Sequence, residues 1–171
     1  MPIEAFARQN CSIARPLSIL GERWTLLVLR QLFLGLRRFD EIQRDMGIAS
    51  NVLAERLKTL VDEGIVERRA YSERPKRYEY RLTEKGRDLQ PILLQLVRWS
   101  DEHMPVPGGR IREAIHLDCD HVFHPVETCS HCGGEIHAGN VTTRLGGGAT
   151  RKHREAERRA RAEIAARDRA A

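Results

Sequence analysis

The sequence lacks any apolar run of membrane-spanning length, and no charged start leads into an apolar signal segment. These absences predict a cytoplasmic protein with no membrane partner. Cysteine is also scarce, with four residues in a chain of 171. Because the cytosol is reducing, we expect these cysteines to hold a metal or to act as reactive thiols rather than to form a structural disulfide.

Catalytic motifs are missing as well. No Ser/His/Asp set, no pair of carboxylates and no phosphate-binding loop stands out, so the sequence does not predict an enzyme. The chain has 29 Lys and Arg against 24 Asp and Glu, but residues 151–171 alone hold eight of the former and four of the latter. The high pI therefore mostly reflects this tail, and a nucleic-acid site has to be sought in local clusters of charge.

Helical periodicity dominates the first third of the chain. Residues 16–35 predict two short helices separated at Gly21, and residues 37–47 predict a third helix that Gly47 ends. In the first pair, the residues expected to face a core are Trp24, Leu27, Val28, Leu32 and Phe33.

A fourth helix is predicted from the segment IASNVLAERLKTLVDEGIV, residues 48–66, with Leu53, Leu57 and Leu60 on one face. Residues 46–50 form a tight, glycine-containing turn between the third and fourth helices. Two short helices joined in this way, the second with a polar outer face, are typical of a helix-turn-helix.

The period then changes from 3.6 to 2. Residues 65–82 predict two strands around the polar tip SERPKR, and a basic hairpin directly after a helix-turn-helix is typical of a wing. Residues 83–103 predict a fifth helix with Thr83 as its N-cap. We expect Pro91 to kink this helix or to mark a step within it. The helix is unusually apolar for a terminal element and is therefore expected to need a partner.

These segments together resemble the HxlR-type winged helix-turn-helix transcriptional regulators, which are relatives of the MarR group. The resemblance runs over about residues 11–103 and includes GERWT at 21–25, GLRRF at 35–39, RPKRYEYRLTEKG at 74–86 and LVRWSDEH at 96–103. It implies an α+β fold in which a winged helix-turn-helix domain carries extra N- and C-terminal dimerisation helices. It also implies a cytoplasmic homodimer that binds an operator with an inverted repeat in double-stranded DNA.

The fourth helix is the element expected to enter the major groove, because only a helix or a two-stranded ribbon fits there. Asn can pair with an adenine edge and Arg with a guanine edge. The wing tip is expected to contact phosphate or the minor groove. The predicted DNA-binding residues are Ser50, Asn51, Glu55, Arg56 and Lys58 in the helix, with Arg74, Lys76 and Arg77 in the wing. Tyr78, Tyr80, Trp24 and Trp99 are expected to serve packing.

Cys11 stands alone ahead of the first helix. In some members of the resembled family a thiol at this position senses oxidants or electrophiles, and Arg8 and Arg15 are near it in the sequence. The alternative role is a small buried hydrophobe at a dimer contact. An oxidant or a small molecule is therefore the predicted effector.

The segment HLDCDHVFHPVETCSHCGG, residues 116–134, contains a complete set of soft metal ligands. Two x2-spaced pairs can wrap the two sides of a tetrahedral zinc ion. A loop-rich unit of about 35 residues also needs a staple, since it buries little core. The predicted ligands of a structural Zn²⁺ are His116, Cys119, Cys129 and Cys132. A redox Cys-x-x-Cys, or buried cysteines in a small hairpin with no metal, are the alternatives.

The predicted organisation has four parts. Residues 1–104 form the DNA-binding and dimerisation domain, residues 105–110 a linker, residues 111–145 a small loop-rich unit that would be a zinc ribbon, and residues 146–171 a basic flexible or helical tail. The predicted function is sequence-specific regulation of transcription. The alternative is a zinc-ribbon interaction or zinc-handling protein whose winged helix serves only protein contacts.

Overall fold

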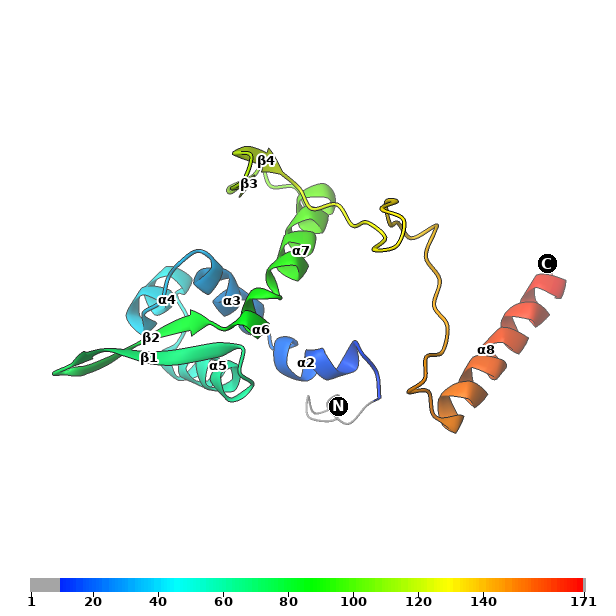
Figure 1. The fold of residues 1–171 in the computed structure, drawn as a ribbon, viewed down its shortest axis with the longest axis horizontal. Helices are drawn as coiled ribbons and strands as arrows, with labels where there is room; N and C mark the ends of the chain where they lie inside the picture. Colours follow the sequence, from blue (N-terminus) through cyan, green and yellow to red (C-terminus); the bar gives the residue numbers. More distant parts are fainter. Residues whose placement is uncertain (1–9, 171) are drawn as a thin grey trace. The chain divides into compact units, whose positions relative to one another are not determined.

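The computed structural model describes residues 10–170 (Figure 1). The chain forms two units, one ending at Pro125 and one beginning at Val126. Each unit is considered by itself. No helix among the described residues is both long enough and apolar enough to cross a membrane.

The first unit begins with two short helices, α2 (Ala14–Leu20) and α3 (Thr25–Phe33), with Gly21 as the C-cap of α2. In α3, Val28 and Leu29 are fully buried and Leu32 nearly so, whereas Leu27 is exposed. Trp24 and Phe33 pack against the core from its edge. The sequence prediction was therefore wrong for Leu27 and missed Leu29, because a period of 3.6 does not fix which neighbouring residue lies at the centre of the stripe.

The helix-turn-helix consists of α4 (Phe39–Met46) and α5 (Ser50–Asp62). Gly47 ends α4 in the left-handed conformation, with φ of 60°, which lets the chain turn sharply toward α5. Leu53, Leu57 and Leu60 of α5 are buried against Ile42 and α3, as the sequence predicts. The hydrophobic core therefore lies between α3, α4 and α5, and it fixes which side of α5 faces outward.

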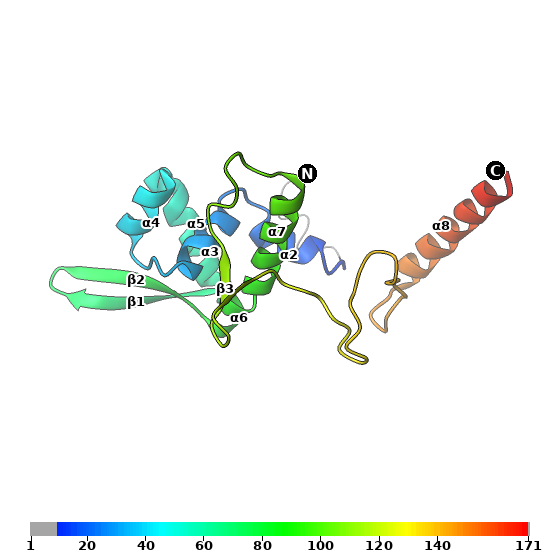
Figure 2. The ribbon, with the colours of Figure 1, turned by 90° about the horizontal axis from the view of Figure 1, so that it is seen from above.

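The wing is an antiparallel hairpin of β1 (Val66–Glu73) and β2 (Lys76–Leu82). Both views show it extending beyond α4 and α5 (Figures 1 and 2). Its register shifts between Ala70 and Ser72, so Tyr71 is an extra residue in β1. At its base the amide of Tyr80 donates a 2.8 Å hydrogen bond to the carbonyl of Arg37, which ties the wing to the start of α4.

The predicted fifth helix consists of two helices, α6 (Glu84–Arg87) and α7 (Gln90–His103), with Pro91 in the first turn of α7. The step expected near Pro91 therefore lies just before it. Gly86 is buried at the base of the wing, where an added Cβ would lie 2.2 Å from the carbonyl oxygen of Ile65. Trp99 was predicted to serve packing, but it is 54% exposed in the single chain, with the ring of His103 beside its own at 5.3 Å between centroids.

After α7 the first unit continues through a short hairpin of β3 (Ala114–His116) and β4 (His121–Phe123). The hairpin is joined to α7, since Arg98 donates a 3.0 Å hydrogen bond to the carbonyl of Pro125. Arg110 also forms a 3.0 Å ion pair with Asp101. These contacts explain why the division between units falls after Pro125 rather than at the predicted linker, residues 105–110.

The second unit contains a small turn around residues 128–135 and the long helix α8 (Arg151–Ala170). The side chains of α8 that the structure describes are mostly exposed, as expected for a helix with almost no large apolar residues. Two ion pairs run along it at i,i+4 spacing, Arg151–Glu155 and Glu157–Arg161. Within this unit α8 is therefore a solvated helix.

Candidate nucleic-acid interface

The outer face of α5 is polar and exposed along its whole length. The buried leucines hold the opposite side of the helix, so Ser50 and Asn51 project outward from its first turn. Lys58 follows two turns on and forms a 2.5 Å ion pair with Asp62 while staying 75% exposed. An exposed Asn near a helix N-terminus can present its amide to a base edge and its backbone N–H groups to phosphate.

Arg56 lies at the side of α5 rather than on this outer face. Its side chain is only 12% exposed, and one amino nitrogen donates a 2.5 Å hydrogen bond to Glu55. Its other amino nitrogen lies 3.9 Å from Glu22, in the loop before α3. The acidic Glu55 is thus paired with a basic neighbour, which is one of the two roles the sequence left open for it.

The wing tip carries the three cations that the sequence predicts. Arg74, Lys76 and Arg77 are all exposed, and within residues 10–170 none of them has an acidic partner. Farther down the strands two of the three arginines are paired, since Arg69 contacts Glu67 at 2.7 Å and Arg81 contacts Glu79 at 2.6 Å. Apart from Arg68, the unneutralised positive charge of the hairpin therefore lies at its tip.

Two further arginines line the groove between the wing and the start of α4. The Cζ atom of Arg38 lies 4.7 Å from the centroid of the Tyr71 ring, and the Cζ atom of Arg68 lies 3.5 Å from the centroid of the Tyr78 ring. The groove has a volume of about 470 Å³ and also contains Lys76 and Arg77. Tyr80 is a core-edge residue as expected, but Tyr78 instead forms a platform for cations.

No sequence pattern pointed to Arg38, because the bridge that brings it to Glu79 joins residues far apart in the chain. Arg68 could have been found, since it alternates with Glu67 and Arg69 along β1. The two arginines extend the basic surface from the wing tip to α4.

Cys11 is exposed just before α2. Hydrogen bonds from the backbone amides of Ala14 and Ile13 hold the pKa of its thiol below its usual range, and the charge of Arg15 adds to this effect. The thiol therefore has more thiolate character than an ordinary cysteine, as a nucleophilic cysteine requires. Since the thiol is exposed in the single chain, the alternative role, as a buried hydrophobe at a dimer contact, would require a second copy to cover it.

The predicted metal ligands fall in two halves, one in each unit. In the first half the Nδ1 atom of His116 lies 3.2 Å from the Sγ atom of Cys119. In the second, backbone amides of Cys132 and His131 lower the pKa of the Cys129 thiol, and the Cys132 side chain adds to this. Over the described residues, no group of three or more His, Cys, Asp or Glu side chains is brought together to hold a metal.

The second half has the shape of a tight turn. The amide of Cys129 donates a 2.8 Å hydrogen bond to the carbonyl of Gly134, and the amide of Gly133 donates one of 2.8 Å to the carbonyl of Cys129. Gly133 has a φ of 71°, which favours glycine. Donors arranged around a cysteine sulfur stabilise a thiolate, which is the form that binds metal.

Comparison with known proteins agrees with this geometry. The uncharacterized HTH-type transcriptional regulator Rv3095 of Mycobacterium tuberculosis is 46% identical over 137 residues, which cover 80% of this chain and 87% of that protein. The HTH-type transcriptional regulator YodB of Bacillus subtilis is 40% identical over 97 residues, covering 56% of this chain and 86% of YodB.

Solved structures are also similar. The crystal structure of PA1607, named as a candidate transcription factor, aligns with a TM-score of 0.73 at 31% identity and covers 84% of this chain and 99% of that one. The redox regulator HypR in its oxidized form aligns with a TM-score of 0.51 at 34% identity, covering 56% of this chain and 100% of HypR. Residues 19–107 match the HxlR-like helix-turn-helix family. The chain therefore belongs to the HxlR-like helix-turn-helix family of DNA-binding transcriptional regulators.

Proposed function

We propose that this regulator acts as a homodimer on an inverted-repeat operator, with α5 in the major groove and the wing on the adjacent backbone or minor groove. The observation that carries this proposal is that one domain has both an exposed polar face on α5 and cations without an acidic partner at the wing tip. Ser50, Asn51 and Lys58 are the candidate base-reading residues, and Arg74, Lys76 and Arg77 are the candidate backbone contacts.

The homodimer is supported by apolar side chains that the first unit leaves exposed. Ile92, Leu96 and Trp99 of α7 are 58%, 49% and 54% exposed and recur at i, i+4 and i+7, on one side of the helix. At α2, the N-cap residue Ile13 is 70% exposed and Leu17 is 42% exposed. An apolar stripe of this kind favours burial against a second copy. In such a dimer the two α5 helices would lie about 34 Å apart, one turn of DNA.

A response to thiol oxidation is the proposed form of regulation, with Cys11 as the sensing residue. The low pKa of its thiol and its exposure support this role. That HypR, a protein of similar fold, is named as a redox regulator adds support. The protein would act in the cytoplasm, where its DNA partner lies, and it would need no catalytic activity.

Zinc remains the proposed metal for His116, Cys119, Cys129 and Cys132. Support comes from each half taken by itself, since the donors within each half lie close together and the turn after Cys129 favours a thiolate. The ion would serve as a structural staple and would take no part in reading DNA.

The proposal is tested by footprinting the purified protein on genomic DNA, with and without a thiol oxidant, and by sedimentation. We expect protection of a site with two half-sites about 10 base pairs apart, and a dimer at micromolar concentration. Leu96→Glu should produce a monomer with much weaker operator binding. The matched control is Val126→Glu, at an apolar residue that is also exposed but lies in the second unit. A wild-type chain that is monomeric both free and on DNA would rule the homodimer out.

A further inference from the structure

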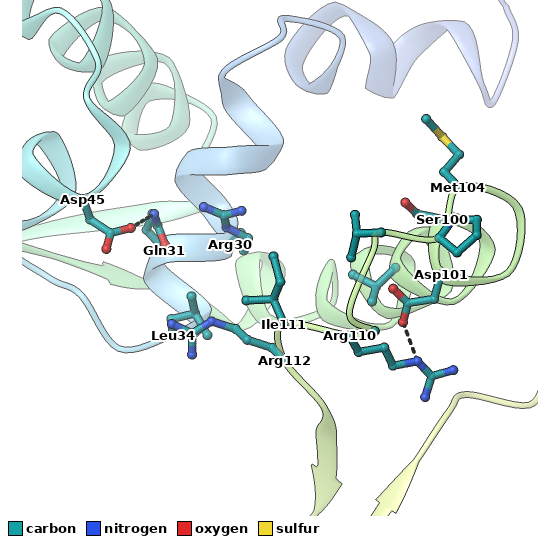
Figure 3. A pocket seen from close by; sticks show the side chains of 14 residues that line it. Arg30, Gln31, Leu34, Asp45, Ser100, Asp101, Met104, Arg110, Ile111 and Arg112 are labelled. Atoms are coloured by element: carbon teal, nitrogen blue, oxygen red, sulfur yellow. Dashed lines mark hydrogen bonds and ion pairs between the residues drawn. The ribbon is translucent and has the colours of Figure 1, made fainter.

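A cavity of about 560 Å³ opens in the first unit between α3, α7 and the residues that follow α7 (Figure 3). This volume lies within the range of small-molecule sites in proteins. None of its lining residues is on the outer face of α5 or at the wing tip, so DNA contact does not account for it. Its apolar lining consists of Leu34, Val97, Met104, Val106 and Ile111, with Pro105 and Gly109 of the connecting chain.

The charged groups of the cavity leave positive charge without a partner. Arg110 is neutralised by Asp101, at 3.0 Å. Arg30 and Arg112 also line the cavity, and neither has an acidic partner in the part of the chain that the structure describes. Asp45 is the remaining acid, and it already accepts a hydrogen bond from Gln31. An apolar wall with two unpaired guanidinium groups suits an organic anion, because Arg binds carboxylates in a bidentate fashion.

Gln31 links this cavity to the helix-turn-helix. Its side chain is fully buried, and its Nε2 atom donates to Asp45 in the last turn of α4 (Figure 3). Its Oε1 atom is buried without a partner among residues 10–170. An unsatisfied buried acceptor is costly, so a bound molecule that donates a hydrogen bond to Oε1 would be favoured. Such a bond can shift the Gln31 side chain and so alter its hydrogen bond to Asp45. Met46, Gly47 and the turn to α5 follow Asp45 in the chain, so a change in the hydrogen bond between Gln31 and Asp45 can reach the DNA-reading helix through the backbone.

We propose that this cavity binds a small organic carboxylate with an apolar body, its carboxylate held by Arg30 and Arg112. Since the cavity wall joins α7 to α3 and α4, the occupant is an effector that changes operator affinity. The effector role rests on the proposed binding of an operator, whereas the binding site itself does not.

The test is titration calorimetry of the full chain with three probes, benzoate, phenylacetate and octanoate, each compared with its neutral amide. At least one carboxylate should bind saturably, and its amide should bind about tenfold more weakly or worse, the loss expected when a charge-assisted bond is removed. Arg30→Gln and Arg112→Gln should each weaken the carboxylate by a similar factor. The control Arg144→Gln, at an exposed arginine outside the cavity, should leave its affinity unchanged.

One further variant and one DNA measurement separate the alternatives. Ile111→Trp should fill the cavity and abolish binding while the melting temperature is retained. If no probe binds, or if binding ignores both Arg30 and Arg112, the site is rejected. If the arginine variants instead change the dimer dissociation constant, a second copy covers the cavity and the proposal fails. A carboxylate that binds but leaves operator affinity unchanged would overturn only the effector role, whereas failure to bind an operator without any probe would overturn only the proposed function.

Discussion

The guanidinium of Arg56 donates a 2.5 Å hydrogen bond to the carboxylate of Glu55, and its second amino nitrogen lies 3.9 Å from Glu22. In this arrangement the arginine that the sequence favours most for reading guanine is engaged within the protein. The neighbouring Asn51 is exposed in the first turn of the same helix. The structure therefore shifts the expected centre of base recognition from Arg56 toward Asn51.

Asn51→Ala should cost about 1–3 kcal/mol at the specific operator and relax its preference at one position. Arg56→Ala should leave the preference largely intact, because the pairing with Glu55 keeps this side chain from the outer face. The measurement is binding to a set of single-base operator variants. Loss of preference in Arg56→Ala but not in Asn51→Ala would show that the arginine leaves Glu55 and Glu22 when DNA binds.

Lys76→Ala should weaken binding to all DNA sequences alike, because an exposed cation at the wing tip contacts phosphate and not base edges. The slope of log K against log salt should fall in magnitude by about one unit. Lys152→Ala, at an exposed residue of α8, is the comparison for the removal of one positive charge elsewhere. Equal slopes for wild type and Lys76→Ala would exclude the wing tip from the interface.

Gly86→Ala should destabilise the first unit by about 1–3 kcal/mol, the range for overpacking, because its new Cβ would overlap the carbonyl oxygen of Ile65. Gly146→Ala is the matched control, since nothing lies within 4 Å of the Cβ position there. Urea unfolding followed by circular dichroism measures both. A Gly86→Ala protein as stable as wild type would mean that α6 does not sit against the base of the wing.

The thiol of Cys11 should react with iodoacetamide faster at pH 7 in the folded protein than in the urea-unfolded chain. The amides of Ala14 and Ile13 lower its pKa, so its thiolate fraction rises at a lower pH than that of a free thiol. The advantage should disappear as the pH rises above the pKa of an ordinary thiol. Mass spectrometry of the labelled peptide gives the rate, and equal rates at pH 7 would remove the basis for a sensing role.

Elemental analysis of the tag-free protein, prepared without added zinc, should find about one zinc per chain. Cys129→Ser should lose the metal and Cys11→Ser should keep it, because metal binding and local folding are one equilibrium at the proposed ligands. A chelator should then loosen residues 111–143 and leave the first hundred residues folded. Well-folded wild-type protein with far less than one zinc per chain would reject the metal.

The sequence was a good guide to the helix-turn-helix and to the wing, since their signals are local. The leucine spacing of α5, the stop at Gly47 and the alternation along the wing each depend on residues close in the chain. Periodicity also identified α7 as unusually apolar. It could not tell whether another part of this chain covers Trp99. Periodicity shows which side chains share a face of a helix, but it does not show what that face packs against.

Contacts between segments far apart in the chain could not be predicted from the sequence. The cation platform at Tyr78 depends on cross-strand geometry near the extra residue in β1. The pairing of Arg56 with Glu22 joins α5 to a loop some thirty residues earlier, and the bond from Gln31 to Asp45 joins two helices. Such pairs follow from how the helices pack, which pattern rules for single elements do not specify.

Different residues of α5 form its buried side and its exposed side. Leu53, Leu57 and Leu60 anchor the helix, with Val52 and Val61 packed at the edge of the core, while Ser50, Asn51 and Lys58 contribute nothing to the buried core. Substitutions at exposed positions of this kind usually change the free energy of unfolding by no more than about 0.5 kcal/mol. Over evolutionary time, duplicated copies of such a regulator can therefore acquire new target sequences without first acquiring compensating mutations in the scaffold.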